Sequence, residues 1–140
     1  MNDCIFCKIA NGEIPSATLY EDEDFRVILD LGPATKGHAL ILPKAHYADL
    51  TEIPEELAGK ATGVAKKVVT AMKAALPCDG YNVVQNNGEA AGQTVFHYHV
   101  HLIPRYVNDH AGVSWKPGEL TDEVNQWQRK IQSTAAAVSV

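Results

Sequence analysis

The sequence predicts a single α+β domain spanning residues 1–140, in which an antiparallel sheet of about five strands carries one long helix and short terminal helices. Five short segments alternate apolar and polar residues and are separated by Gly, Pro, Asn and acidic residues, as half-buried strands are. A longer segment between the third and fourth of them repeats its apolar residues every three or four positions, which is typical of an amphipathic helix. The chain length suits one domain with one core.

The expected strands follow one another along most of the chain, at residues 18–20, 25–29, 38–42, 81–85 and 95–103. The acidic stretch EDED between the first two is short enough for a hairpin turn. The stretch DLGPATKG joins the second strand to the third through Gly, Pro and a tight bend. The early part of the sheet is therefore expected to be antiparallel.

The long helix is expected within residues 53–77. Pro54 and the acidic Glu55 and Glu56 suit its first turn, and Pro77 ends it. Its apolar stripe consists of Leu57, Ala61, Val64, Val68, Met72 and Ala75. Shorter helices are expected at 7–11 and 121–133, and the final AAAVSV is expected to fray.

Composition narrows the class of partner. The formal net charge is −5 and the sequence has no run of Lys or Arg, which argues against nucleic acid or an anionic membrane as the main partner. No apolar window approaches the length of a membrane-spanning helix, and the N-terminus lacks the pattern of a signal peptide. We therefore expect a soluble, cytoplasmic protein that binds a small ligand.

Three of the six histidines occur at alternate positions in FHYHVHLIPRY, as His97, His99 and His101. On a β-strand alternate side chains share one face, so these imidazoles would line one surface at intervals of roughly 6.6 to 6.8 Å. The intervening residues, Tyr98, Val100 and Leu102, would point into the opposite layer. A neutral imidazole can attack phosphorus at physiological pH without a metal, and its neighbours can donate hydrogen bonds to the phosphate oxygens.

The loop before this strand, NNGEAAGQTV, suits a phosphate group. Gly88 and Gly92 permit backbone conformations that point several N–H groups at one anion. Asn86, Gln93 and Thr94 add neutral hydrogen-bond partners. The same residue types also form ordinary turns. The loop indicates a phosphate site mainly because it directly precedes the histidines.

The run His97-Tyr98-His99-Val100-His101-Leu102-Ile103 resembles the His-φ-His-φ-His-φ-φ signature of the histidine-triad family of nucleotide hydrolases and transferases, where φ is apolar. The blocks CIFCKIANGEIPSATLYEDEDF, LDLGPATKGHALILPKAH and NNGEAAGQTVFHYHVHLIPRY resemble the compact bacterial, Hint-like branch of that family. The resemblance covers residues 4–106 and leaves 107–140 as a C-terminal extension. It implies the family's fold and a homodimer.

The resemblance also implies roles for the histidines. His99 would attack the α-phosphorus of a nucleotide and carry a transient nucleotidyl group, and His101 would bind the phosphate. His38 would join the cluster from the neighbouring strand, and His97 would buttress it. The transferase branch has Gln at the third motif position, so His101 favours hydrolysis.

The nucleotide-binding residues are implied in the same way. Asp30 would accept both ribose hydroxyls, although a residue at that place can equally form a turn. Asn86, Gln93 and Thr94 match positions that contact the phosphate or the leaving group. The base pocket would be walled by apolar residues that could also be ordinary core residues, namely Phe6, Ile9, Ile14 and Leu31.

The resemblance favours hydrolysis of purine nucleoside phosphoramidates or related conjugates of AMP or GMP. Two alternatives stay open: a dinucleoside polyphosphate hydrolase, and a zinc-stabilised nucleotide-binding scaffold protein. Catalysis itself is expected to need no cofactor.

A second site is expected at the N-terminus, where Cys4 and Cys7 have the spacing of a zinc knuckle. With His46 and His97 they could complete a structural Cys₂His₂ zinc site. Two reduced, non-ligating cysteines and a redox pair are the alternatives. Because His97 would then serve both sites, either its other ring nitrogen or its backbone carbonyl is left to orient His99.

Overall fold

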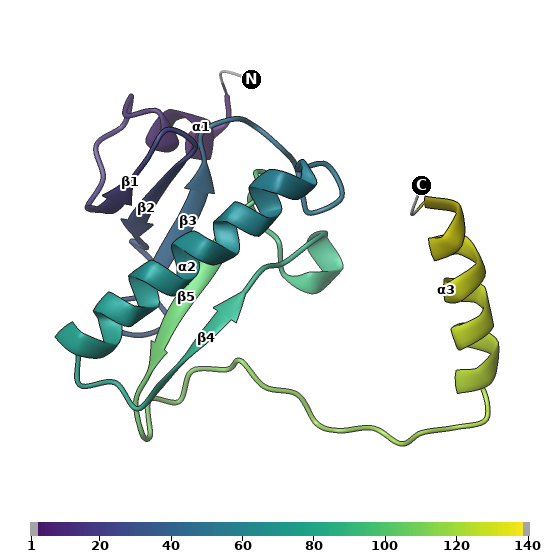
Figure 1. The fold of residues 1–140 in the computed structure, drawn as a ribbon. Helices are drawn as coiled ribbons and strands as arrows, with labels where there is room; N and C mark the ends of the chain where they lie inside the picture. Colours follow the sequence, from purple (N-terminus) through teal and green to yellow (C-terminus); the bar gives the residue numbers. More distant parts are fainter. Residues whose placement is uncertain (1–2, 139–140) are drawn as a thin grey trace.

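The structure is a computed structural model that describes the backbone of residues 3–138 and the side chains of residues 3–134. Its centre is a five-stranded sheet in the order β1-β2-β3-β5-β4, in which all neighbours are antiparallel (Figure 1). The strands are β1 Thr18–Glu21, β2 Phe25–Leu29, β3 Ala39–Pro43, β4 Gly80–Val84 and β5 Val100–Arg105. This confirms the predicted α+β class, the strand number and the hairpin formed by β1 and β2.

The helices are α1 Ile5–Ala10, α2 Glu55–Ala75 and α3 Val124–Val138, with a 3-10 turn η1 at Glu89–Ala91. The helix α1 begins two residues earlier than expected because the sulfur of Cys4 caps it, accepting from the backbone N–H of Cys7 at 3.4 Å. The terminal helix α3 lies further along than 121–133. It continues through residue 138, so the expected fraying is wrong up to that point, and residues 139–140 lie outside the described residues. None of the helices described combines the length and apolarity of a membrane span.

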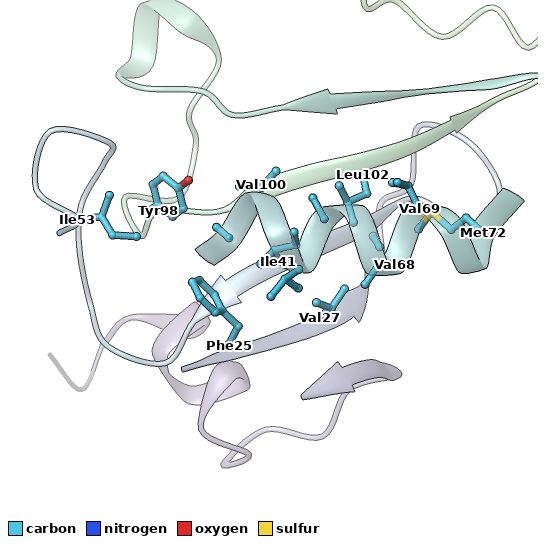
Figure 2. Packing of buried hydrophobic residues seen from close by; sticks show 14 residues of the cluster. Phe25, Val27, Ile41, Ile53, Val68, Val69, Met72, Tyr98, Val100 and Leu102 are labelled. Carbon is cyan, nitrogen blue, oxygen red and sulfur yellow. The ribbon is translucent and has the colours of Figure 1, made fainter. Parts of the chain in front are cut away.

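The main core lies between α2 and one face of the sheet (Figure 2). The inner face of the helix packs on buried side chains from β2, β3 and β5, and the buried part of the predicted stripe is Ala61, Val64, Val68 and Met72. A smaller cluster on the other face joins Ile28, Leu40 and Leu42 to Phe6 and Ile9 of α1. Since α2 covers only one face, the opposite face is left for the histidines.

The expected strand at 95–103 is wrong in its bounds, because β5 begins only at Val100. Its ladder with β3 pairs residues 100–102 alone, and just before it the N–H of Tyr98 donates to the carbonyl of Tyr47 at 2.6 Å. His97 and His99 therefore lie on an irregular segment directly before β5. The side chains still alternate between the two faces of the sheet, because Tyr98 packs in the main core under α2.

Candidate active site and metal site

A pocket of about 410 Å³ opens on the sheet face opposite α2. It gathers eight of the residues expected to form the active site, namely Phe6, Ile9, Ile14, Asp30, Leu31, Thr94, His99 and His101. Four others lie outside its lining, namely His38, Asn86, Gln93 and His97. The pocket is largely apolar at the α1 end and carries imidazoles at the β5 end.

Hydrogen bonding defines the tautomer of His99. Its Nδ1 lies 2.7 Å from the backbone carbonyl of His97. A carbonyl only accepts, so Nδ1 carries the proton and Nε2 keeps its lone pair. The ring is only 6% exposed, and burial lowers its pKa below the usual value. His99 is therefore a neutral imidazole with a lone pair, in the wall of the pocket.

A second chain of hydrogen bonds defines His38 and His101. The N–H of Ala34 donates to Nδ1 of His38 at 2.9 Å, so the proton of His38 sits on Nε2. That Nε2 lies 2.9 Å from Nδ1 of His101, which must accept and must carry its own proton on Nε2. Burial and the neighbouring histidines lower the pKa of His101 to about 4, and burial lowers that of His38. The lone pair of His99 thus stands beside an N–H donor, with ring centroids 5.0 Å apart.

Asp30 forms the turn considered for it and also reaches the pocket, while its ribose role stays a prediction. Its Oδ1 accepts from the N–H of Gly32 at 2.8 Å, which forms the turn after β2. Its Oδ2 lies 3.6 Å from Nε2 of His38 at the pocket wall. One oxygen therefore shapes the backbone while the other can accept from a ligand.

Asp30, His38 and His101 also bring three potential metal-ligating atoms within 4.8 Å of one another. The geometry argues against a cation there. Both ring nitrogens of His38 already have partners, one accepting from Ala34 and one donating to His101. Ligation through Nε2 would require either an imidazolate or loss of the Ala34 hydrogen bond.

Both glycines of the Gly-rich loop have positive φ, 89° at Gly88 and 96° at Gly92. Their N–H groups donate within the loop, to Gln93 and to Glu89, and are not directed at an anion. Gln93 is 2% exposed, and its side chain holds the loop instead of facing the pocket. Its Oε1 accepts from the Gly88 N–H at 2.7 Å, and its Nε2 donates to the carbonyls of Ala48 at 2.7 Å and Val95 at 3.2 Å. Asn86 is half-buried beside Gly92. Its phosphate role and that of Gln93 stay predictions.

The base-pocket residues differ in exposure. The ring of Phe6 packs edge-on against His99, with centroids 4.9 Å apart, whereas Leu31 is 97% exposed at the rim. Sequence reasoning missed Ile28 and Leu40, which face each other across β2 and β3 and line the floor. Their neighbours in the strands pack under α2, so alternation of faces could have found them. Ser16 also lines the pocket, and no sequence pattern marks it.

Cys4, Cys7, His46 and His97 come together as predicted, with one potential ligand atom from each within 4.8 Å of all the others. The sulfur of Cys7 lies 3.3 Å from Nδ1 of His46 and 3.5 Å from Nδ1 of His97, and the two Nδ1 atoms are 3.2 Å apart. Tetrahedral Zn²⁺ with ordinary bond lengths separates S and N by about 3.6 Å and two N atoms by about 3.3 Å. The donor set therefore fits zinc in both type and spacing.

Electrostatics at this cluster also suit a cation. Burial, and then the adjacent Cys4, raise the pKa of the Cys7 thiol to about 11. Two neighbouring thiols resist becoming thiolates together unless a positive charge joins them. All three cysteines are free thiols.

The structure shows how His97 is shared between the two sites. Its Nε2–H donates to the carbonyl of Pro43 at 2.8 Å, so Nδ1 offers its lone pair to the cysteine cluster. Its backbone carbonyl accepts from His99. Of the two arrangements considered, the structure has the one in which the backbone orients His99. The side chain of His97 faces the cluster of Cys4, Cys7 and His46, and burial lowers its pKa to about 4.

Acid should weaken the fold through His101. This residue titrates near 6.5 when unfolded and at about 4 when folded, so the unfolded chain binds more protons between these pH values. Stability is therefore expected to fall as the pH is lowered from 6.5 towards 4. In urea unfolding across this range, His101→Gln should show a shallower loss, by about 1.4 kcal/mol per pH unit. Identical slopes in the two proteins would contradict a neutral, buried His101.

Comparisons with known proteins agree with this site geometry. A model of the HIT domain matches residues 11–108. The adenosine 5′-monophosphoramidase HNT1 of Saccharomyces cerevisiae is 47% identical over 121 residues, covering 85% of this chain and 73% of the yeast protein. The crystal structure of a HIT family protein from Bacillus anthracis is 41% identical with a TM-score of 0.87, and the match covers 99% of each chain. A Zn-bound histidine triad family protein from Mycobacterium smegmatis is 36% identical with a TM-score of 0.76, and again 99% of each chain is covered. The chain belongs to the HIT domain family.

Proposed function

We propose that this protein hydrolyses purine nucleoside phosphoramidates or related AMP and GMP conjugates at the α-phosphate, through a covalent nucleotidyl-histidine intermediate. The observation that carries the proposal is the pairing of a neutral His99, with its Nε2 lone pair at the pocket, and the N–H donor of His101 beside it. The yeast relative named as an adenosine 5′-monophosphoramidase supports the substrate class.

In the proposed first step, Nε2 of His99 attacks the α-phosphorus. A phosphorus–nitrogen bond forms while the bond from phosphorus to the leaving amine breaks. The amine takes one proton from solvent as it departs, and the water that attacks in the second step returns one to solvent. The developing charge on the phosphate oxygens would be met by Nε2–H of His101 and by Thr94, both of which line the pocket. As the bond forms, positive charge grows on the imidazole of His99, and its Nδ1–H stays directed at the His97 carbonyl.

In the second step, water attacks the same phosphorus, the phosphorus–nitrogen bond breaks and the nucleoside monophosphate leaves. The apolar end of the pocket, with Phe6 and Ile9, would hold the purine, and Oδ2 of Asp30 would accept from the ribose.

The decisive experiment compares turnover of a fluorogenic AMP phosphoramidate with that of diadenosine polyphosphates. Faster cleavage of the polyphosphates would favour the alternative hydrolase, and absence of turnover on both would favour a binding protein.

The ribose contact predicts a selective effect of Asp30→Asn. The amide oxygen of asparagine can still accept from Gly32, so the turn and the fold are expected to persist. Loss of the carboxylate should raise KM for ribonucleotides about tenfold or more and blunt the preference over 2′-deoxy analogues, with kcat less affected. The measurement is kcat and KM for an AMP phosphoramidate and its 2′-deoxy counterpart. An unchanged preference would remove Asp30 from the ribose site.

We also propose that Cys4, Cys7, His46 and His97 hold a structural Zn²⁺. When bound, zinc would fix the first turn of α1 to the chain segment before β5. The Zn-bound Mycobacterium smegmatis relative supports the choice of metal. The proposed assembly is a homodimer, and the three free thiols fit a reducing compartment such as the cytoplasm.

A further inference from the structure

The lining of the active-site pocket includes one polar side chain that the proposed function leaves without a role. Among the described residues, the polar side chains in this lining are those of Asp30, Thr94, His99, His101 and Ser16. The first four are proposed to meet the ribose and the phosphate. Ser16 belongs to a different part of the wall, the segment 14–17, which borders the apolar end.

A hydroxyl in an otherwise apolar wall affects which ligand the pocket prefers. A purine carries hydrogen-bonding atoms around its rim, and enclosing one of them among apolar side chains without a partner costs free energy. A well-placed hydroxyl removes that cost for the atom it meets, and it disfavours a ligand that lacks the atom. Ser16 is half-buried, so its side chain is part of the wall and not a freely solvated surface group.

Strand register places Ser16 beside the residue proposed to hold the ribose. The strand β1 is the edge strand next to β2 (Figure 1). The N–H of Leu29 donates to the carbonyl of Ala17 at 2.9 Å, which continues the β1–β2 ladder beyond the first residue of β1. The next pair in this antiparallel register is Ser16 and Asp30. Residues directly opposite each other share a face of the sheet, and both of these line the pocket.

On its other side, Ser16 adjoins the wall proposed for the base. Ile14, two residues earlier in the chain, lines the apolar end of the pocket together with Ile28 of β2. Ser16 therefore lies between the base wall and the carboxylate of Asp30. In a purine nucleotide, the atom at the junction of base and ribose is N3, which accepts hydrogen bonds in both adenine and guanine.

A chain of hydrogen bonds anchors the Ser16 hydroxyl. Its Oγ lies 3.2 Å from Oγ1 of Thr18, and that Oγ1 accepts from Nη1 of Arg26 at 3.1 Å. The guanidinium of Arg26 is held in turn by the carbonyl of Ala10 at 3.1 Å and by the carboxylate of Glu21 at 3.0 Å. Because Thr18 accepts from Arg26, its own proton can be donated to Ser16. The proton of Ser16 is then free for a ligand.

We propose that Ser16 is a specificity-determining residue of the pocket, and that its hydroxyl donates to N3 of the bound purine. Asp30 would hold the ribose on one side of this contact, and the apolar walls would enclose the rest of the ring. The contact favours purines that have an acceptor at this position. It rests on the proposed function, because it takes a purine nucleotide to be the ligand of this pocket.

The test measures binding, so its result does not depend on turnover. Titration calorimetry of the full-length wild type should show about five- to tenfold weaker binding of 3-deaza-AMP, in which C–H replaces N3, than of AMP. Ser16→Ala should weaken AMP binding by a similar factor and leave 3-deaza-AMP binding unchanged. Ser16→Thr keeps a hydroxyl and should retain most of the preference. Ser133→Ala, which removes an exposed hydroxyl from α3, is the control and should bind both ligands as the wild type does.

The same titrations can contradict the assignment in distinct ways. Equal affinities of the wild type for AMP and 3-deaza-AMP, or equal weakening of both ligands by Ser16→Ala, would leave Ser16 as an ordinary part of the wall. An effect of Ser16→Ala that disappears with 2′-deoxy-AMP and persists with 3-deaza-AMP would move the contact to the ribose. Wild-type protein that binds AMP with the expected preference but cleaves no phosphoramidate would contradict the proposed function and keep the role of Ser16. Wild-type protein that binds no AMP would overturn both.

Discussion

Replacing His99 by alanine or glycine is expected to abolish turnover, with a loss of several orders of magnitude in kcat. The role proposed for this residue is covalent, so no neighbouring group can replace it. Its Nε2 lone pair depends on the bond from Nδ1–H to the His97 carbonyl, and its ring lines the pocket. Nucleotide binding should survive, because the apolar walls and Asp30 are unchanged.

His101→Ala is the matched comparison on the same segment. It removes one donor to the phosphate oxygens without removing the nucleophile, so the expected loss is on the order of 10²-fold. Quenching wild-type protein during turnover of a radiolabelled AMP phosphoramidate should trap an acid-labile, alkali-stable adduct on His99. An adduct on His97 or His101, or full activity in His99→Ala, would overturn the covalent mechanism.

Much of the fold was predictable because local patterns determine it. Alternating apolarity located the first four strands closely, and the three- and four-residue spacing located α2 between Pro54 and Pro77. The errors fall where tertiary contacts override the pattern. The alternation through His97 and His99 has the appearance of a strand, but the Tyr98 N–H bonds to Tyr47 and not to β3. An isolated sequence pattern carries no information about that partner.

The site was predictable in its residue types and less so in its roles. Spacing and resemblance brought together His38, His99 and His101, and the structure joins all three. What the sequence could not supply is the direction of each proton, because that depends on backbone groups such as the Ala34 N–H and the carbonyl of His97. Gln93 differs from these histidines, because its side chain does not face the pocket. It was expected at the phosphate, and the structure uses its side chain to hold the loop.

Loss of the proposed zinc site is expected to destabilise the fold more than any single core substitution. Cys4→Ser with Cys7→Ser should abolish zinc binding and lower Tm by more than about 10 °C, because zinc-binding energy is folding energy where the ligands assemble only on folding. Cys78→Ser is the matched control, since this half-buried free cysteine lies outside the cluster. It should keep both the zinc and the Tm. Metal analysis should find about one zinc per chain in the wild type.

The pH dependence separates zinc ligation from simple thiol packing. Without a metal, the pKa of Cys7 is about 11, so zinc must displace thiol protons when it binds near neutral pH. Affinity should therefore rise with pH up to that pKa, and zinc uptake in weak buffer should release protons measurably. The same uptake should shift the ¹⁵N signal of Nδ1 in His97, whose lone pair faces the cluster, while Nε2 stays bonded to Pro43. Wild-type protein that takes up no zinc, or a double serine variant with an unchanged Tm, would leave Cys4 and Cys7 as ordinary reduced cysteines.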